Sequence, residues 1–552
     1  MLSHADTPTS GSAMTEFTPF PTDRASFYRD AGYWSGRTLD EILRTAATNW
    51  PDHPAVVDDS TRLTYAELDR RADAAAAGLL ALGIDEGHRV VVQLPNNCEF
   101  AVALFGLLRA GALPVLCLPG HRDAELAHFL DVSGAVGIIV GTDVGFDYRA
   151  MAERLLNRPN ALQHVVIDGD AGPHVSWSQL CAGDGQPPRR CPDPSGPAVL
   201  LVSGGTTGAP KLIPRTHDDY VYNATASAEL CQLTGDDVYL VALPAGHNFP
   251  LACPGLLGAM TVGATVVFGT DPSPEAAFAT IARHGVTVTA LVPALARLWA
   301  QACEWEEQPP ATLRLLQVGG AKLAADDARH IRTALTPGLQ QVFGMAEGLL
   351  CYTRIGDPPG IVERTQGRPL AAHDELHIVD DAGAAVPEGE PGELLVRGPY
   401  TINGYFRADA ENNRSFTPDG FYRTGDRVRH VADGYLEVTG RVKDVIVRAG
   451  ETVSALDLES HLLAHPGVFA AAALGLPDPY LGEKICAAVV FRDTPIALSD
   501  LNAYLDARGV AVHGRPDMIA PMPALPMTAV GKVDKRAIVA ELNREPAQRA
   551  TR

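Results

Sequence analysis

Residues 198–211 read AVLLVSGGTTGAPK, an apolar run followed at once by a loop of glycine, serine and threonine. The apolar run has the length and composition of a buried strand. Glycines let the backbone come close to an anion, and free N–H groups and hydroxyls can donate hydrogen bonds to phosphate oxygens. The loop is not a Walker A loop, because no Gly-Lys-Ser/Thr ends it and Pro210 interrupts the expected helix start. Alone, it is equally compatible with a Gly-rich surface turn.

The same rhythm of short apolar strands and helical stretches extends on both sides of this loop. Thr64 and Glu67 have the spacing of a capping box and predict a helix that runs to about Leu82. Short buried strands alternating with helices predict an α/β fold with largely parallel sheets. The other strands are expected within 88–95, 113–119, 136–141, 164–168, 264–269, 286–293 and 313–320, with a buried helix at 99–111.

From about residue 373 the pattern changes to alternating polar and apolar residues separated by turns. Segments such as HDELHIVDDAG and GELLVRGPY predict antiparallel hairpins, which form a small β-barrel-like part of the large domain. After about residue 440 the chain predicts a compact α+β tail with its own helix and strand. We therefore expect a polar tail at 1–15, an N-terminal core at 16–439 and a C-terminal domain at 440–552.

Composition excludes several classes of function. The chain has 552 residues, so at least two domains are expected, and its net charge of −21 argues against a binder of nucleic acid. Nine cysteines without a C-x-x-C pair, and the absence of an N-terminal apolar signal, favour a reducing cytoplasm. No apolar run reaches about 18 residues, so no membrane span is expected.

Five motifs in order resemble those of the adenylate-forming enzymes, which include acyl- and aryl-CoA synthetases, luciferases and peptide-synthetase adenylation domains. Their order and spacing agree with that family from about residue 30 to 540, and the resemblance implies its fold, with a mobile C-terminal domain. The motifs are SGGTTGAPK at 203–211, QVFGMAE at 341–347, FYRTGD at 421–426, Gly440-Arg441 and GKVDK at 531–535.

The resemblance implies that the chain joins a carboxylate to the α-phosphate of ATP and releases pyrophosphate. Such a reaction depends on positioning and on neutralising charge. By resemblance, Lys532 bridges the carboxylate and the α-phosphate, Glu347 helps to hold Mg²⁺, and His247 is the third catalytic residue. The ATP and AMP site would comprise Ser203, Gly204, Gly205, Thr206, Thr207, Gly208 and Lys211 at the phosphates, Gly320, Ala321, Val342, Phe343 and Gly344 near adenine, and Asp426 and Arg441 at the ribose.

Two features narrow the resemblance to the aryl-acid branch of the family, which acts in siderophore assembly. Many members carry aspartate at the hinge where this chain has Lys443, and the aryl-acid branch has lysine there. The same branch has QVFGMAEG nearly as written here, with Ala346 where other members have threonine. The hinge is expected at about 441–444.

Residues 244–254, PAGHNFPLACP, would line the acid pocket by the same resemblance. Three prolines argue against a regular helix here. An amide at Asn248 can donate to a phenol oxygen ortho to the carboxylate. Cys253 stands where the 2,3-dihydroxybenzoate enzymes have serine, and a thiol is a weak donor, which favours salicylate. The apolar walls would be Phe249, Val342, Ala346 and Leu350.

The implied acceptor is the phosphopantetheine thiol of an aryl carrier protein. Two alternatives stay open: 2,3-dihydroxybenzoate as the acid, and free CoA as the acceptor. A carrier protein and CoA present the same pantetheine arm, and the sequence does not separate them.

Overall fold

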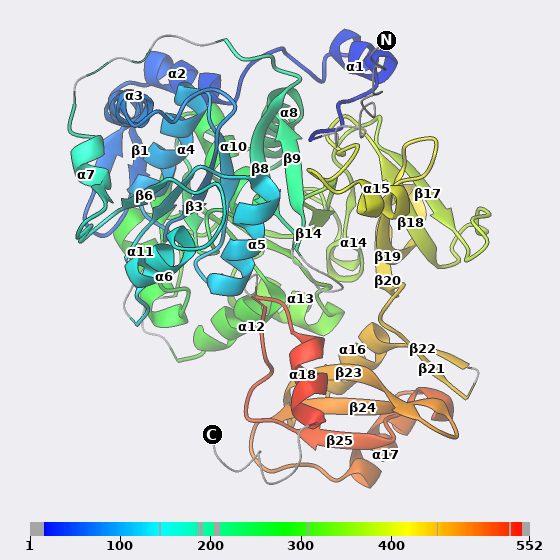
Figure 1. The fold of residues 1–552 in the computed structure, drawn as a ribbon. Helices are drawn as coiled ribbons and strands as arrows, with labels where there is room; N and C mark the ends of the chain where they lie inside the picture. The colour runs from blue at the N-terminus through cyan, green and yellow to red at the C-terminus, as the bar shows by residue number, and fades with distance from the viewer. Residues whose placement is uncertain are drawn as a thin grey trace, which may run out of the picture.

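The computed structural model describes residues 16–142, 145–183, 185, 187, 191–203, 210–305, 309–449, 451–528 and 531–543. The expected tail at 1–15 lies outside these residues. Within them, two large mixed sheets with helices form the N-terminal part, a small antiparallel sheet follows, and a further sheet forms the C-terminal part (Figure 1). No helix of the described residues is long and apolar enough to cross a membrane.

The sheet that carries the Gly/Thr loop has the strand order β7-β6-β5-β3-β4-β8-β9. All neighbouring pairs are parallel except β8 and β9, which form an antiparallel pair around the loop. The strands are β3 (Arg89–Gln93), β4 (Leu113–Leu116), β5 (Gly137–Val140), β6 (His164–Ile167), β7 (Val175–Ser176), β8 (Pro197–Val202) and β9 (Leu212–Thr216).

The second sheet has the order β16-β15-β14-β13-β12-β10-β11-β1-β2. Its central pairs, from β1 and β11 to β13 and β14, are parallel, and its outer pairs are antiparallel. The strands are β1 (Pro54–Val57), β2 (Arg62–Thr64), β10 (Val238–Val241), β11 (Thr265–Phe268), β12 (Val288–Leu291), β13 (Leu315–Gly319), β14 (Leu339–Met345), β15 (Gly348–Tyr352) and β16 (Arg368–Pro369).

Helices pack against both sheets. The predicted capping box is confirmed: Glu67 N donates to Thr64 Oγ1 at 3.2 Å, and Thr64 N donates to Glu67 Oε2 at 2.8 Å. The helices of this part are α1 (Thr22–Asp30), α2 (Asp40–Asn49), α3 (Tyr65–Ala81), α4 (Cys98–Ala110), α5 (Asp123–Ser133), α6 (Tyr148–Leu156), α7 (Trp177–Leu180), α8 (His217–Leu230), α9 (Asn248–Ala252), α10 (Gly255–Thr261), α11 (Pro274–His284), α12 (Pro293–Ala302), α13 (Ala325–Ala334) and α14 (Pro359–Arg364).

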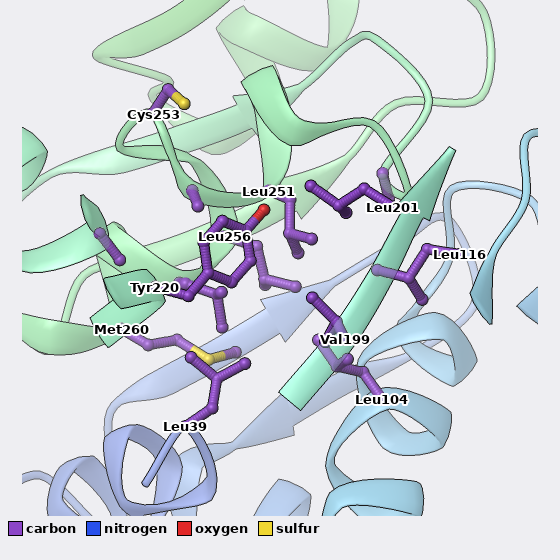
Figure 2. Close-up of a cluster of buried hydrophobic side chains, with 14 of the residues drawn as sticks. Leu39, Leu104, Leu116, Val199, Leu201, Tyr220, Leu251, Cys253, Leu256 and Met260 are labelled. Carbon is purple, nitrogen blue, oxygen red and sulfur yellow. The ribbon is translucent and has the colours of Figure 1, made fainter. Parts of the chain in front are cut away.

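One large apolar core joins the two sheets. It contains Val199 and Leu201 of β8, Leu104 of α4, and Leu256 and Met260 of α10, all buried (Figure 2). Helix α8 follows β9 directly and contributes side chains to the same core. The Gly/Thr loop and the segment 244–254 are therefore attached to one common core, because the elements that flank both of them are packed into it.

The alternating segments form the predicted antiparallel sheet, with the order β17-β18-β19-β20. Its strands are β17 (Glu375–Val379), β18 (Gly392–Arg397), β19 (Tyr422–His430) and β20 (Leu436–Arg441), and α15 (Asp409–Ser415) lies between β18 and β19. The α/β fold class with its antiparallel part is confirmed.

The C-terminal sheet follows β20 after three residues. It has the order β22-β21-β24-β23, and β25 pairs with β24. Its elements are β21 (Val445–Arg448), β22 (Glu451–Ser454), α16 (Ala455–Leu463), β23 (Val468–Asp478), β24 (Gly482–Phe491), α17 (Leu498–Ala507), β25 (Met518–Pro521) and α18 (Lys535–Leu542). The domain boundary at about 440 stays a prediction.

Candidate active site

The two ends of the Gly/Thr loop are joined by two hydrogen bonds between Ser203 and Lys211. Ser203 N donates to Lys211 O at 2.9 Å, and Lys211 N donates to Ser203 Oγ at 2.9 Å. This closure extends the antiparallel pairing of β8 and β9 by one step, so the two strands hold the mouth of the loop. The loop residues expected at the phosphates, Gly204, Gly205, Thr206, Thr207 and Gly208, lie outside the described residues.

Lys211 is paired with a carboxylate that the sequence did not point to. Its ammonium forms an ion pair with Glu411 of α15 and lies 4.8 Å from the centre of the Tyr405 ring. Although burial opposes it, hydrogen bonds from Lys211 and Arg414 lower the pKa of Glu411 to about 2. The loop lysine is therefore held by a fully charged partner about 200 residues away in the chain.

Glu347 is buried and accepts a hydrogen bond within a chain of phenols. Tyr405 Oη donates to Glu347 Oε1 at 2.9 Å, and the hydroxyls of Tyr405 and Tyr422 are 3.0 Å apart. Burial raises the pKa of Tyr422 well above its ordinary value, so the phenol stays neutral. Tyr405 thus fixes one carboxylate oxygen of Glu347 and, through its ring face, also contacts Lys211.

Asp426 and Arg441 face each other across adjacent strands. Their Cα atoms are register partners of β19 and β20, and Arg441 Nε donates to Asp426 Oδ1 at 2.9 Å. Asp426 raises the pKa of Arg441, so the guanidinium stays charged. The register of the hairpin therefore brings together two residues that the sequence expects at the ribose.

Lys532 reaches this site from the loop before α18. A Cβ added to Gly320 would lie 3.8 Å from Lys532 Cε, so the lysine lies against the end of β13. Burial and the positive charge of Arg441 lower the pKa of Lys532, while Asp426 and Glu347 oppose the shift. The structure therefore brings Lys532 close to residues that the sequence analysis expects at the nucleotide.

His247 is a further residue on which the charge of Lys532 acts. It is the N-cap of α9, and its Nδ1 accepts a hydrogen bond from Phe249 N at 3.2 Å. Burial and the charge of Lys532 lower the pKa of His247 to about 4, so the imidazole is neutral near pH 7. The expectation that prolines exclude a helix here was wrong, because Pro250 occupies the first turn of α9, where its missing N–H has no helical partner to lose.

Asn248 and Cys253 are buried side by side at the two ends of α9. Asn248 Nδ2 donates to Cys253 Sγ at 3.4 Å, and Asn223 Nδ2 lies 3.9 Å from the same sulfur. The thiol donates to Asn248 O at 3.4 Å. Burial raises the pKa of Cys253 to about 12, so the sulfur is a neutral thiol and a weak partner.

The expected apolar walls come from α9, β14 and β15, with Ala346 in the turn between the two strands. A Cβ added to Gly319 would lie 3.1 Å from ring atoms of Phe249, and one added to Gly344 would lie 2.5 Å from Leu350 Cδ2. Glycine at these two places lets the walls come together. Val342 and Leu350 are buried, Phe343 and Ala346 are partly buried, and Gly320 and Ala321 are exposed at the end of β13.

Lys443, the residue expected at the hinge, and the possible metal ligands were each located in the structure. Lys443 is exposed in the short connection between β20 and β21. Among the described residues, no group of three or more His, Cys, Asp or Glu side chains could hold a metal ion.

Several residues that the sequence analysis did not identify form hydrogen bonds or ion pairs with the predicted site residues. They include Glu411 at Lys211, Tyr405 at Glu347, and Tyr220 and Arg215 behind Asn248 and Ala346. None belongs to one of the five motifs. Their partners are far along the chain, so no local spacing could have indicated them.

Comparison with known proteins identifies the family of the chain. The model of the AMP-binding enzyme family matches residues 43–406, and that of the AMP-binding enzyme C-terminal domain matches 457–532. A Mycobacterium tuberculosis protein named salicyl-AMP ligase / salicyl-S-ArCP synthetase is 69% identical over 535 residues, covering 95% of this chain and 94% of the relative. The Bacillus subtilis 2,3-dihydroxybenzoate-AMP ligase is 46% identical over 525 residues, covering 95% and 97%.

Solved structures of related proteins have the same fold. The apo structure of Mycobacterium smegmatis MbtA has 68% sequence identity and a TM-score of 0.75, and covers 95% of this chain and 99% of that one. The anthranilate CoA ligase AuaEII in complex with anthranoyl-AMP has a TM-score of 0.84 at 23% identity, covering 93% and 98%, and so shares the fold.

Proposed function

The chain belongs to the AMP-binding enzyme family, and we propose that it activates salicylate as salicyl-AMP and passes the salicyl group to a phosphopantetheine thiol. We place this reaction in siderophore assembly, with an aryl carrier protein as the acceptor. The relative that is 69% identical is named for these two steps. The cytoplasm is the proposed compartment, and the nine free cysteines suit a reducing environment.

The observation that carries the choice of substrate is the arrangement of Asn248 and Cys253. A buried amide beside apolar walls suits a flat ring with one polar acceptor, because the amide otherwise has only the weak acceptor Cys253 Sγ, and a buried donor without a good partner costs about 1–3 kcal/mol. Cys253 is a neutral thiol that already contacts Asn248 and Asn223. It offers little to a second phenol, which favours salicylate over 2,3-dihydroxybenzoate.

In the first step, a carboxylate oxygen of salicylate attacks the α-phosphorus of ATP, and the bond from that phosphorus to pyrophosphate breaks. We assign to Lys532 the bridging of the two anions, because its side chain lies against Gly320 and its charge acts on His247. Its positive charge stabilises the charge that accumulates on the phosphorus oxygens. Lys211 would leave its ion pair with Glu411 and bind the phosphates of the departing pyrophosphate instead.

In the second step, the deprotonated thiol of the pantetheine arm attacks the acyl carbon, and the bond from that carbon to the oxygen of AMP breaks. A lysine on a small separate domain can serve the first step and then move away. Lys443 in the exposed connection after β20 is the proposed hinge residue. A domain boundary at about 440 is part of the same proposal.

Mg²⁺ fits the residues that are present. Glu347 supplies one buried carboxylate, and Tyr405 occupies only its Oε1. Mg²⁺ is usually held by one or two carboxylates together with phosphate oxygens and water, so the single buried carboxylate of Glu347 is compatible with it. When bound, the ion would neutralise the charge of the ATP phosphates.

The deciding experiment is ATP–pyrophosphate exchange with the purified protein and a panel of substituted benzoates. Salicylate should give the highest kcat/KM, followed by 2,3-dihydroxybenzoate and then benzoate. If no aryl acid supports exchange, the proposed function is wrong. Incubation with a phosphopantetheinylated aryl carrier protein or with CoA then identifies the acceptor, and thioester should form on the carrier.

A further inference from the structure

The amide oxygen of Asn248 is already occupied. Tyr220 of α8 donates its hydroxyl proton to Asn248 Oδ1 at 2.8 Å, and both side chains are buried. Burial raises the pKa of Tyr220 well above its ordinary value, so the phenol keeps its proton and acts as a donor. The ring of Tyr220 lies within the apolar core with Leu251 and Leu256 (Figure 2).

This bond determines what Asn248 can offer a ligand. With Oδ1 used by Tyr220, only the NH₂ group remains, and it now donates to the weak acceptor Cys253 Sγ at 3.4 Å. A ligand oxygen is a better acceptor than a thiol and would take over this hydrogen bond. The side chain therefore presents a donor to the pocket, and not an acceptor.

Arg215 of β9 supports this arrangement from behind. Its guanidinium lies 4.5 Å from the centre of the Tyr220 ring, and the side chain is fully buried. The same group donates to Ala346 O at 3.0 Å and to Asp219 Oδ1 at 2.8 Å. One buried cation thus contacts the phenol that holds Asn248 and the backbone of the opposite wall at Ala346.

We infer that Tyr220, supported by Arg215, is a positioning residue that makes the pocket select an acceptor at the ortho position of the acid. This inference rests on the proposed function. In salicylate the phenol proton is shared with the neighbouring carboxylate, so the phenol oxygen is free to accept from Asn248. An ortho amine, as in 2-aminobenzoate, chiefly donates, and so meets another donor in Asn248.

The test is Tyr220→Phe, which removes one hydroxyl and keeps the ring over Arg215. Without the bond to Oδ1, the Asn248 amide can turn and offer its oxygen to an amine. The kcat/KM ratio of salicylate to 2-aminobenzoate should fall by about 2- to 10-fold in pyrophosphate exchange, with the KM for ATP unchanged. Tyr65→Phe is the matched control, because Tyr65 is also buried and donates to Ala264 O at 2.6 Å, away from the pocket.

A double-mutant cycle separates positioning from a general loss of stability. If Tyr220 acts through Asn248, Tyr220→Phe should not change the ratio in an Asn248→Ala background. An unchanged ratio in the single variant, or an equal change in both backgrounds, overturns the inference while the proposed function stands. Failure of wild type to exchange with any aryl acid overturns the proposed function itself.

Discussion

In the proposed acid pocket the polar groups are fixed by neutral, buried hydrogen bonds, whereas on the proposed nucleotide side the charged groups are held by ion pairs. Asn248 is bound by Tyr220, while Lys211 is paired with Glu411 and Arg441 with Asp426. A neutral buried partner stays in place when the ligand arrives, so it can impose selectivity. An ion pair that is partly exposed can exchange a protein charge for a ligand charge at small cost.

Lys532 belongs to neither arrangement. It comes from the C-terminal part, and its pKa is lowered by burial and by Arg441, so its charge is poorly compensated before the anions bind. The comparison therefore predicts a graded series of effects. Substitution of Lys532 should change the kinetics most, substitution of Asn248 should have a smaller effect, and substitution of Glu411 in the ion pair with Lys211 should have the smallest.

Lys532→Ala should reduce the kcat/KM of adenylation by about 10²–10³-fold, because a charge aimed at the transition state is lost. Thioester formation from supplied salicyl-AMP should change far less. Lys535→Ala is the control, since Lys535 lies three residues away and pairs with Glu459 at 2.8 Å. Equal losses in the two half-reactions would argue against a lysine that serves only the first.

Asn248→Ala should lower the salicylate-to-benzoate ratio of kcat/KM by about 5- to 150-fold, which corresponds to one buried hydrogen bond. The KM for ATP should stay constant, because the amide faces the acid. Exchange kinetics with both acids provide the measurement. An unchanged ratio would show that the segment 244–254 does not form the acid pocket.

The sequence predicts the fold well where the signal is local. The capping box at Thr64, the buried strand before the Gly/Thr loop, and the alternating strands after residue 373 all depend on neighbours in the chain. Each is recovered in the structure because side-chain period and capping act over a few residues. The short helix α9 was missed, because three prolines outweighed the N-cap at His247.

The contacts behind the site could not be predicted in this way. Glu411 lies 200 residues from Lys211, and Arg215 lies 131 residues from Ala346. A tyrosine on a helix is usually a core residue, and nothing in the sequence around Tyr220 distinguishes it from others. Only the packing of α8 against α9 and β9 brings its hydroxyl to Asn248.

Cys253→Ser should raise the preference for 2,3-dihydroxybenzoate relative to salicylate by about 2- to 10-fold, because a hydroxyl donates and accepts more strongly than a thiol. The effect is smaller than that of Asn248→Ala, since only a weak partner is replaced. Cys253→Ala is the matched control. If alanine and serine shift the ratio equally, the added hydroxyl is not the cause and Cys253 serves only to pack the core.

Glu411→Gln tests whether the ion pair between Lys211 and Glu411 is exchanged for the phosphates of ATP. ATP phosphates must compete with Glu411 for Lys211, so removing the carboxylate should lower the KM for ATP by about 1.5- to 5-fold, the range of a partly exposed ion pair. Asp409→Asn removes the same charge from the first residue of the same helix and is the control.

The pH dependence of this last effect follows from the lowered pKa of Glu411. A folded-state pKa of about 2 means that the pair's contribution is fully present above the ordinary pKa of a glutamate and is lost only as the pH falls toward 2. The gain in Glu411→Gln should therefore be constant between about pH 6 and 9, and should shrink as salt is added. A rise in the KM for ATP would instead show that Glu411 holds Lys211 in its working position, and the ion pair would then belong with the fixed contacts of the acid pocket.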